Sequence, residues 1–353
     1  MAANGRRKYW GIVVPLMPAE MIAASAKQME DAGIHGVYAI QVYGPPWIPL
    51  AAAATSTGRV QLLTGIAQAF ARSPFETAMA AIDLDRISNG RFILGLGSTV
   101  RSWSEGVFGM PGYGKPVEHL RETVEVIRHI VANAHTGALG EHHGTYHHFD
   151  WSEFCGSLPP LRTEIPIWLA PVRGPMIELA GEIADGYCSH PIWSQRWATS
   201  VAQDHLRKGL ERAGRQRSDF HQCIWQWCTP NRDPKESIED ARACVAFYAG
   251  VQQYQSYYAA HGFEKEALQL QEGVRRGDYL SVAHLVPDEM ASTFVVTGTP
   301  DEVRRKVEPL WEVADSMALI PPALTLPPEK SMAYFETIAE VFYAEGAPAP
   351  VLR

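Results

Sequence analysis

One stretch, residues 58–110, decides the fold class of this chain: GRVQLLTGIAQAFARSPFETAMAAIDLDRISNGRFILGLGSTVRSWSEGVFGM. It opens with an apolar run rich in strand formers, after which Ser73, Pro74 and Glu76 supply an N-cap, a first-turn proline and a capping-box acid. Apolar residues then recur at helical spacing up to an Asn-Gly pair, and a second apolar run covers residues 91–97. This pattern predicts a strand–helix–strand unit. A crossover of this length makes the two strands parallel and adjacent, with their carboxyl ends at the same rim.

Small side chains gather where these two predicted strands end. They are Thr64, Gly65, Ile66 and Ala67 on the first strand, and Gly97, Ser98, Thr99 and Val100 on and after the second. Backbone that lacks bulky side chains allows a flat ligand to approach. An alternative interpretation is that the glycines only relieve crowding inside a packed barrel. Gly95 and Gly97 also resemble part of a dinucleotide fingerprint, but Val100 replaces its third glycine and no helix follows at once, so we reject that motif.

Composition limits the class of partner. The chain has 353 residues, of which 46% are hydrophobic, and this suits one large α/β domain as well as two small ones. Its net charge of −8 gives no electrostatic footprint for nucleic acid or for an anionic membrane. We therefore expect a small-molecule partner, no nucleic acid and no membrane.

The sequence shows no targeting or membrane segment, because the basic residues near its start are followed by a strand pattern and not by a signal-peptide core. We expect a cytoplasmic protein, and a homo-oligomer, a dimer, although no residue pattern specifies that state. The 5 cysteines are widely spaced and none forms a CxxC pair, so we expect thiols rather than disulfides or a zinc site.

Strand and helix patterns alternate along the chain. The expected strands are residues 9–16, 36–42, 60–69, 91–97, 165–171, 186–191, 219–229 and 316–320. The expected helices are residues 18–32, 49–57, 74–88, 117–134, 173–183, 193–213, 299–311 and 329–343. Such alternation indicates an α/β fold with one closed (β/α)8 barrel, a TIM barrel, over residues 1–353; an open doubly wound sheet is the second choice.

Two insertions interrupt the alternation. Residues 135–164 are too long for an ordinary connection and contain five histidines, so we expect an irregular lid or edge of a site. Residues 234–295 follow a second cap, proline and acid pattern at Asp233, Pro234 and Glu236, and we expect them to form a helical subdomain.

Three blocks resemble a known family. They are GRFILGLGS at residues 90–98, LAPVRGPMIELAGEIADG at 169–186 and VVTGTPDEVRRKVEP at 295–309. In this order they are similar to the luciferase-like monooxygenase superfamily, and most of all to its actinobacterial branch of oxidoreductases that use the deazaflavin coenzyme F420. The resemblance covers most of residues 9–345.

The resemblance implies a luciferase-like barrel that holds an isoalloxazine or its deaza analogue across the carboxyl ends of the strands. In relatives the third strand carries a non-proline cis peptide beneath the ring, and Gly65-Ile66 matches that position. Family contacts to the cofactor phosphate match Val172, Arg173, Gly174 and His190. Free N–H groups of the helix that begins near Gly174 suit a phosphate, Arg173 adds charge, and His190 adds charge only when it is protonated. An alternative interpretation of Arg173 is a solvated loop arginine.

This chain departs from the family at the end of the second strand. Deazaflavin dehydrogenases often place an acid–histidine pair there, whereas this chain has Gln41, Val42 and Tyr43, so the usual proton donor is missing. Trp47 matches a family tryptophan nearby. A proton would have to come from Tyr43, Glu105, His190 or the insertion, unless the substrate needs none. The candidate catalytic residues are therefore Gln41, Tyr43, Trp47, Glu105 and His190.

The resemblance favours an oxidoreductase that transfers a hydride between F420 and an organic substrate. An FMN-dependent monooxygenase is the first alternative, because both cofactors share the ring and the first phosphate. A barrel that binds a ligand without catalysis is the second. A metal-dependent hydrolase is suggested only by His142, His143, His147 and His148, and the first strand lacks the paired-histidine motif of such barrels, so we expect no metal.

Overall fold

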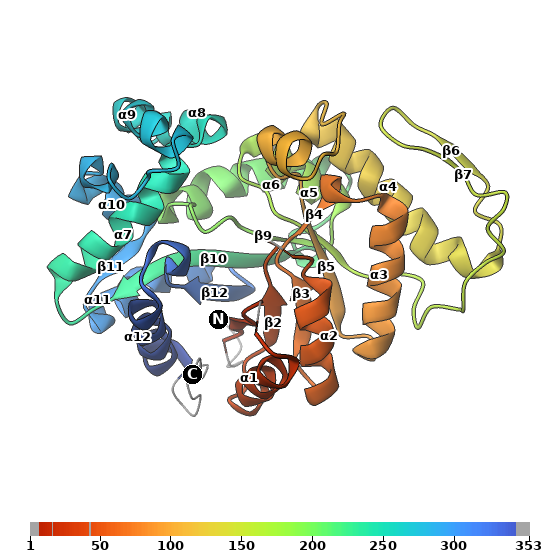
Figure 1. The fold of residues 1–353 in the computed structure, drawn as a ribbon, viewed down its shortest axis with the longest axis horizontal. Helices are drawn as coiled ribbons and strands as arrows, with labels where there is room; N and C mark the ends of the chain where they lie inside the picture. The colour runs from red at the N-terminus through yellow and green to blue at the C-terminus, as the bar shows by residue number, and fades with distance from the viewer. Residues whose placement is uncertain (1–6, 16, 42–43, 344–353) are drawn as a thin grey trace. The chain divides into compact units, whose positions relative to one another are not determined.

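Residues 7–15, 17–41 and 44–343 are the part of the chain that the computed structural model describes. The chain divides into two compact units. The N-terminal unit comprises residues 10–188 and 205–221, and the C-terminal unit comprises residues 1–9, 189–204 and 222–353. Figure 1 shows their strands and helices coloured along the chain. That residues 1–353 form one domain stays a prediction.

The N-terminal unit contains a parallel sheet in the order β1–β2–β3–β5–β8–β9. Its strands are β1 Trp10–Ile12, β2 Gly36–Ala39, β3 Gln61–Thr64, β5 Phe92–Gly97, β8 Ile167–Leu169 and β9 Gly186–Cys188. A short further strand, β4 Ala67–Gln68, pairs with β5. Each strand lies where the sequence predicts one, but is shorter than predicted.

Helices follow the strands of this unit and pack on one another in chain order, α1 on α2, α2 on α3, α3 on α4 and α4 on α5. They are α1 Ala19–Asp31, α2 Trp47–Ser56, α3 Pro74–Ile87, α4 Pro116–Asn133 and α5 Gly174–Ile183, while α6 Ala202–Arg212 crosses between the units. α3 begins as predicted, because the Ser73 hydroxyl accepts the Glu76 N–H at 3.1 Å. It stops at Asn89 and Gly90, whose φ angles are 53° and 79°.

The predicted strand 60–69 is interrupted. β3 ends at Thr64, the Gly65–Ile66 peptide bond is cis, and β4 resumes pairing with β5 through Ala67 opposite Leu96 and Gln68 opposite Gly97. The cis peptide bond that the family resemblance implies is thus present at the expected position.

The first insertion is more regular than predicted. It contains an antiparallel hairpin of β6 Glu141–His143 and β7 His148–Asp150. The turn between them lies on α4, because the Glu122 carboxylate accepts the backbone N–H groups of Thr145, Tyr146 and His147 at 2.7–3.1 Å. Its strands have three residues each, all of them polar except Phe149, and so short a pattern gives no apolar alternation that sequence reasoning could detect. A role as lid stays a prediction.

The C-terminal unit has a long strand, β10 His221–Pro230, which begins in the N-terminal unit at its first residue and pairs in parallel with β12 Ser316–Ile320 and β11 Val296–Gly298. The second insertion is helical as expected, with α7 Pro234–Ala249, α8 Gln255–Ala259, α9 Glu264–Arg275 and α10 Asp288–Phe294. The chain continues with α11 Pro300–Val307 and α12 Pro328–Ile338. β11 was not expected, because three residues are too few to show a period.

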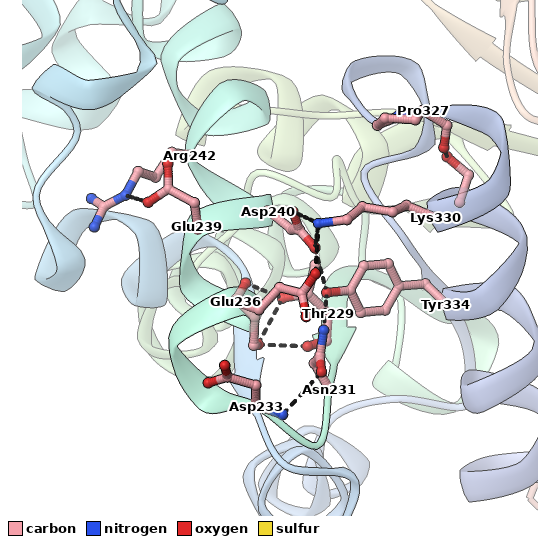
Figure 2. A network of polar contacts seen from close by, with 12 residues as sticks. Thr229, Asn231, Asp233, Glu236, Glu239, Asp240, Arg242, Pro327, Lys330 and Tyr334 are labelled. Carbon is pink, nitrogen blue, oxygen red and sulfur yellow. Dashed lines mark hydrogen bonds and ion pairs between the residues drawn. The ribbon is translucent and has the colours of Figure 1, made fainter.

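A polar network, which we call the Asp240 network, joins α12 to α7 and to the end of β10 (Figure 2). Lys330 donates to Asp240 Oδ1 at 2.7 Å and also contacts Glu236 at 2.8 Å. Tyr334 donates to Asp240 Oδ2 at 2.8 Å and accepts from the Asn231 amide at 3.1 Å. These bonds hold the last helix in place.

Candidate functional site

The carboxyl ends of β3, β5 and β8 meet in an apolar floor made by Ile66, Gly97 and Ala170. A Cβ atom added to Gly97 would lie 2.5 Å from Cδ1 of Ile66 and 3.6 Å from Cβ of Ala170. The Ile66 side chain therefore lies directly on Gly97, and Ala170 adjoins it. A floor of this kind offers a flat apolar ring a surface to lie on.

The glycines beneath this floor serve the packing of the chain on itself. A Cβ atom on Gly95 would come within 2.0 Å of the Thr64 carbonyl oxygen. The Thr64 hydroxyl accepts the Gly95 N–H at 2.8 Å and donates to the Gly95 carbonyl at 2.9 Å. The glycines at 95 and 97 are thus needed for close packing of the chain, and their role toward a ligand stays a prediction.

A left-handed turn follows β5 and is fastened by a tyrosine. Thr99 has a φ angle of 52°, and its carbonyl accepts the Tyr113 hydroxyl at 2.9 Å. The Val100 carbonyl accepts the N–H groups of Trp103 and Ser104, which begins the π-helical stretch Ser102–Val107. The chain thus leaves the candidate site through a turn whose geometry is fixed on both sides.

Glu105, a candidate proton donor, is engaged in holding this loop. Its Oε1 accepts from the Arg101 guanidinium at 2.7 Å and from the Tyr113 N–H at 3.3 Å. The contacts thus give Glu105 a supporting role for Tyr113.

Gln41 and Gln68 form a reciprocal pair at the ends of β2 and β4. The Gln68 N–H donates to Gln41 Oε1 at 2.9 Å, and Gln68 Nε2 donates to the Gln41 carbonyl at 3.1 Å. These two bonds fix which way each amide points. Gln68 Oε1 is then left buried with no hydrogen-bond partner in the described structure.

Arg72 contacts both Gln41 and Trp47. It donates to Gln41 Oε1 at 3.4 Å, and its guanidinium lies 5.6 Å from the centre of the Trp47 ring. Burial lowers the pKa of Arg72, and the nearby Glu76 opposes that shift. Gln41 and Trp47 therefore lie close together, as expected, but a neutral amide and a guanidinium stand where dehydrogenase relatives are expected to carry an acid and a histidine.

Val172, Arg173 and Gly174 lead into α5. Arg173 is the N-cap and is exposed, and its carbonyl accepts the N–H groups of Met176 and Ile177. Gly174 is required there by close packing, since a Cβ atom would lie 2.3 Å from the His205 ring. The positive end of the α5 dipole and the Arg173 charge thus lie together, an arrangement that suits an anion.

His190 follows β9 and belongs to the C-terminal unit. Its Nδ1 accepts the Ile192 N–H at 3.2 Å, which places the proton of the neutral ring on Nε2. The rings of Trp227, Tyr248 and Tyr254 surround it at 5.1–6.1 Å. Burial lowers the pKa of His190 to about 3, and a role of His190 in phosphate binding stays a prediction.

Three further predictions concern Tyr43, the cysteine thiols, and metal or membrane binding. Tyr43 lies outside the described residues. All five cysteines are free thiols, and the described ranges hold no cluster of His, Cys, Asp or Glu suited to a metal ion. Among the described helices none has the length and hydropathy to cross a bilayer.

Sequence reasoning missed three residues at this edge, Gln68, Arg72 and Tyr113. Gln68 lies within an apolar strand pattern, Arg72 in a helix-start segment and Tyr113 among Gly and Pro residues. An amide inside an otherwise apolar strand is a usable signal, because a buried polar side chain needs a partner. No comparable pattern marks Arg72 or Tyr113.

A protein-family model and a named relative both match most of this chain. The family model described as luciferase-like monooxygenase matches residues 5–314. A Mycobacterium tuberculosis protein named "Putative coenzyme F420-dependent oxidoreductase" is 30% identical over 321 residues, which are 87% of this chain and 90% of that protein.

Solved structures share the fold. The coenzyme F420-dependent tetrahydromethanopterin reductase of Methanopyrus kandleri has a TM-score of 0.78 at 23% identity and covers 97% of this chain and 100% of its own. The oxygenating constituent of 3,6-diketocamphane monooxygenase of Pseudomonas putida, in complex with FMN, has a TM-score of 0.65 at 17% identity, covering 99% and 100%. These likenesses confirm the predicted luciferase-like (β/α)8 fold class. The chain belongs to the luciferase-like monooxygenase family.

Proposed function

We propose that this protein is an F420-dependent oxidoreductase that transfers a hydride between the deazaflavin and an organic small molecule. The observation that carries the proposal is the apolar floor of Ile66, Gly97 and Ala170 at the carboxyl ends of three neighbouring strands. Ligands of parallel α/β folds bind at this end of the strands. The similarity to an F420-dependent protein over 87% of the chain supports the choice of cofactor.

The residues present fit a tricyclic cofactor with an anionic tail. Ile66, Gly97 and Ala170 suit the apolar ring, and Gln68 Oε1, buried without a donor among the described residues, suits a ring N–H or a hydroxyl. Arg173 and the N-terminus of α5 suit the phosphate, while Val172 and Gly174 fix the backbone there. When bound, the deazaflavin supplies a carbon centre that accepts or donates a hydride.

The described residues leave acid–base work at this edge without an acid. Gln41 does not titrate, Glu105 is paired with Arg101, and burial keeps His190 neutral. The protein therefore binds and orients, and Tyr43 and the insertion of residues 135–164 remain candidate donors. This arrangement suits a reaction in which hydride transfer needs no strong acid from the protein.

Equilibrium titration with F420 and, separately, with FMN tests the proposal. We expect F420 to bind with a dissociation constant of about a micromolar or tighter, and FMN and nicotinamide cofactors to bind more weakly. Tighter binding of FMN would instead support an FMN-dependent monooxygenase. Binding of F420 without substrate turnover across alcohols, ketones and unsaturated acids would support a ligand-binding barrel without catalysis. Failure to bind either cofactor would refute the proposal.

A further inference from the structure

We propose that Tyr113 is a positioning residue, whose hydroxyl holds the Ser98–Thr99 turn in the conformation that the ligand meets at the end of β5. The inference rests on the proposed function in one respect, namely that a ligand binds at this edge. No residue of the loop after Val100 other than Glu105 was expected to serve the site, and Tyr113 lies 14 residues beyond Thr99.

Thr99 is the residue that needs to be held. Its φ angle of 52° lies in the left-handed region, where a β-branched side chain is rarely found. Glycine would adopt this conformation readily, and the following region contains several glycines that do, among them Gly109, Gly112 and Gly114. Threonine there must be kept in place by its surroundings.

The Tyr113 hydroxyl supplies that restraint. It donates to the Thr99 carbonyl at 2.9 Å, and that carbonyl is the group whose direction the left-handed turn sets. The Ser98 hydroxyl bonds the same carbonyl at 3.3 Å, so two hydroxyl groups converge on it. Rotation of Thr99 to an ordinary conformation would break both bonds.

Tyr113 is itself held in place by contacts with four other residues. Its N–H donates to Glu105 Oε1, and its carbonyl bonds Nδ1 of His119 at 3.1 Å. The Arg101 guanidinium lies 5.0 Å from the centre of its ring, and the Phe70 ring meets it edge-on at 5.5 Å. Phe70 lies two residues after β4, so Tyr113 joins the segment that follows β4 to the turn that follows β5.

The phenol keeps its proton at neutral pH. Burial raises the pKa of Tyr113, against the lowering effects of Ser98, Arg101 and Arg173. The hydroxyl is therefore a constant donor to Thr99, and its role does not depend on titration.

A double-mutant cycle with Tyr113→Phe and Thr99→Gly tests the inference, with F420 affinity and backbone amide exchange of residues 97–101 as readouts. Tyr113→Phe should weaken F420 binding about fivefold and speed exchange in that segment, because one hydrogen bond to the turn is lost. In the Thr99→Gly background the same change should alter affinity by less than about twofold, since glycine adopts the left-handed conformation without the steric cost that threonine bears and that the Tyr113 bond offsets.

Tyr334→Phe is the matched control, because it also removes one buried tyrosine hydroxyl. It should lower thermal stability and leave both F420 affinity and the exchange of residues 97–101 unchanged. Unchanged exchange in Tyr113→Phe, or a loss of the same size in the Thr99→Gly background, would overturn the inference. Amide exchange is measured without ligand, so it decides the role of Tyr113 even if the wild-type protein binds neither F420 nor FMN, an outcome that would refute only the proposed function.

Discussion

Each unit buries a tyrosine and fixes its hydroxyl, but the partners differ. Tyr334 of the C-terminal unit, 4% exposed, donates to the Asp240 carboxylate within the Asp240 network (Figure 2). Tyr113 of the N-terminal unit, 9% exposed, donates to the backbone carbonyl of Thr99. One hydroxyl serves a network of charges between helices, and the other serves the conformation of a single turn.

The two units thus use their buried polar groups differently, one for stability and the other for the conformation of a turn. Asp240 is 8% exposed and would be costly if unpaired, so Lys330, Tyr334 and the packing of α12 all depend on one another. The Tyr113 bond joins two neutral groups, and its net contribution to stability is small. Loss of the Asp240 network should therefore lower the free energy of unfolding. Loss of the Tyr113 bond should weaken ligand binding.

The largest effect is expected for Asp240→Ala. Removal of the carboxylate leaves Lys330 and the Tyr334 hydroxyl without their shared acceptor, and we expect a loss of about 3 kcal/mol in the free energy of unfolding. F420 affinity should stay the same. Urea unfolding and cofactor titration measure the two quantities.

Glu236→Ala is the control for that change, because Glu236 contacts the same Lys330 but is partly exposed. It should lower the free energy of unfolding much less than Asp240→Ala does, because solvent screens an exposed ion pair. Equal losses in the two variants would mean that burial of Asp240 does not set the strength of the network.

Arg173→Ala should give the next largest effect, and it acts on binding alone. A charged hydrogen bond to a phosphate contributes about 1.5–3 kcal/mol, so we expect the F420 dissociation constant to rise at least about tenfold. The ratio should shrink at high salt, where screening has already weakened the wild-type contact. Calorimetric titration at two salt concentrations measures it.

Arg207→Ala, which removes an exposed arginine paired with Glu211 on α6, is the control and should leave affinity unchanged. An early melting temperature for Arg173→Ala with normal affinity would instead assign Arg173 to folding. Such a result would also contradict the distinction between a C-terminal unit whose polar network stabilises the fold and an N-terminal unit whose polar groups serve ligand binding.

A smaller, pH-dependent effect is expected in the N-terminal unit from His147, whose Nε2 lies 2.8 Å from the Thr123 hydroxyl. Burial, followed by the nearby His119, lowers the pKa of His147 to about 4. The unfolded chain thus takes up this proton at a higher pH than the folded chain, so stability should be complete above about pH 6.5 and fall toward pH 4.

His147→Gln should flatten this part of the curve of unfolding free energy against pH. His148→Gln, a change at an exposed neighbour whose charge contributes least to the lowered pKa of His147, should alter the curve much less. A wild-type stability that does not change between these pH values would contradict the assignment.

The smallest effect concerns His190. Since burial lowers the pKa of its ring to about 3, the ring carries no charge at physiological pH. The ratio of F420 dissociation constants between His190→Ala and wild type should then be the same at about pH 5.5 and about pH 8. A ratio that grows as pH falls would restore the charged role predicted from the sequence.

Local signals in the sequence predicted local structure well. α3, α7 and α11 begin where a cap residue, a proline and an acid coincide, and Ser73, Asp233 and Thr299 each accept a backbone N–H of the first turn. β12 has the predicted bounds, residues 316–320. Failures occurred where a segment is too short or too polar to show a period, as in β11 and the hairpin of residues 141–150.

Short-range patterns and motif order are enough to predict the family and the alternation of strands and helices. They also predict the position of the apolar edge around Ile66 and Gly97. Only the tertiary structure decided what the polar residues do there. It joined Gln41 to Gln68, placed Arg101 and Tyr113 on Glu105, and set the half-buried His190 among aromatic rings. The physical reason is that hydrogen bonding and pKa depend on which groups meet across distant segments, and the pattern along the chain contains no record of that distance.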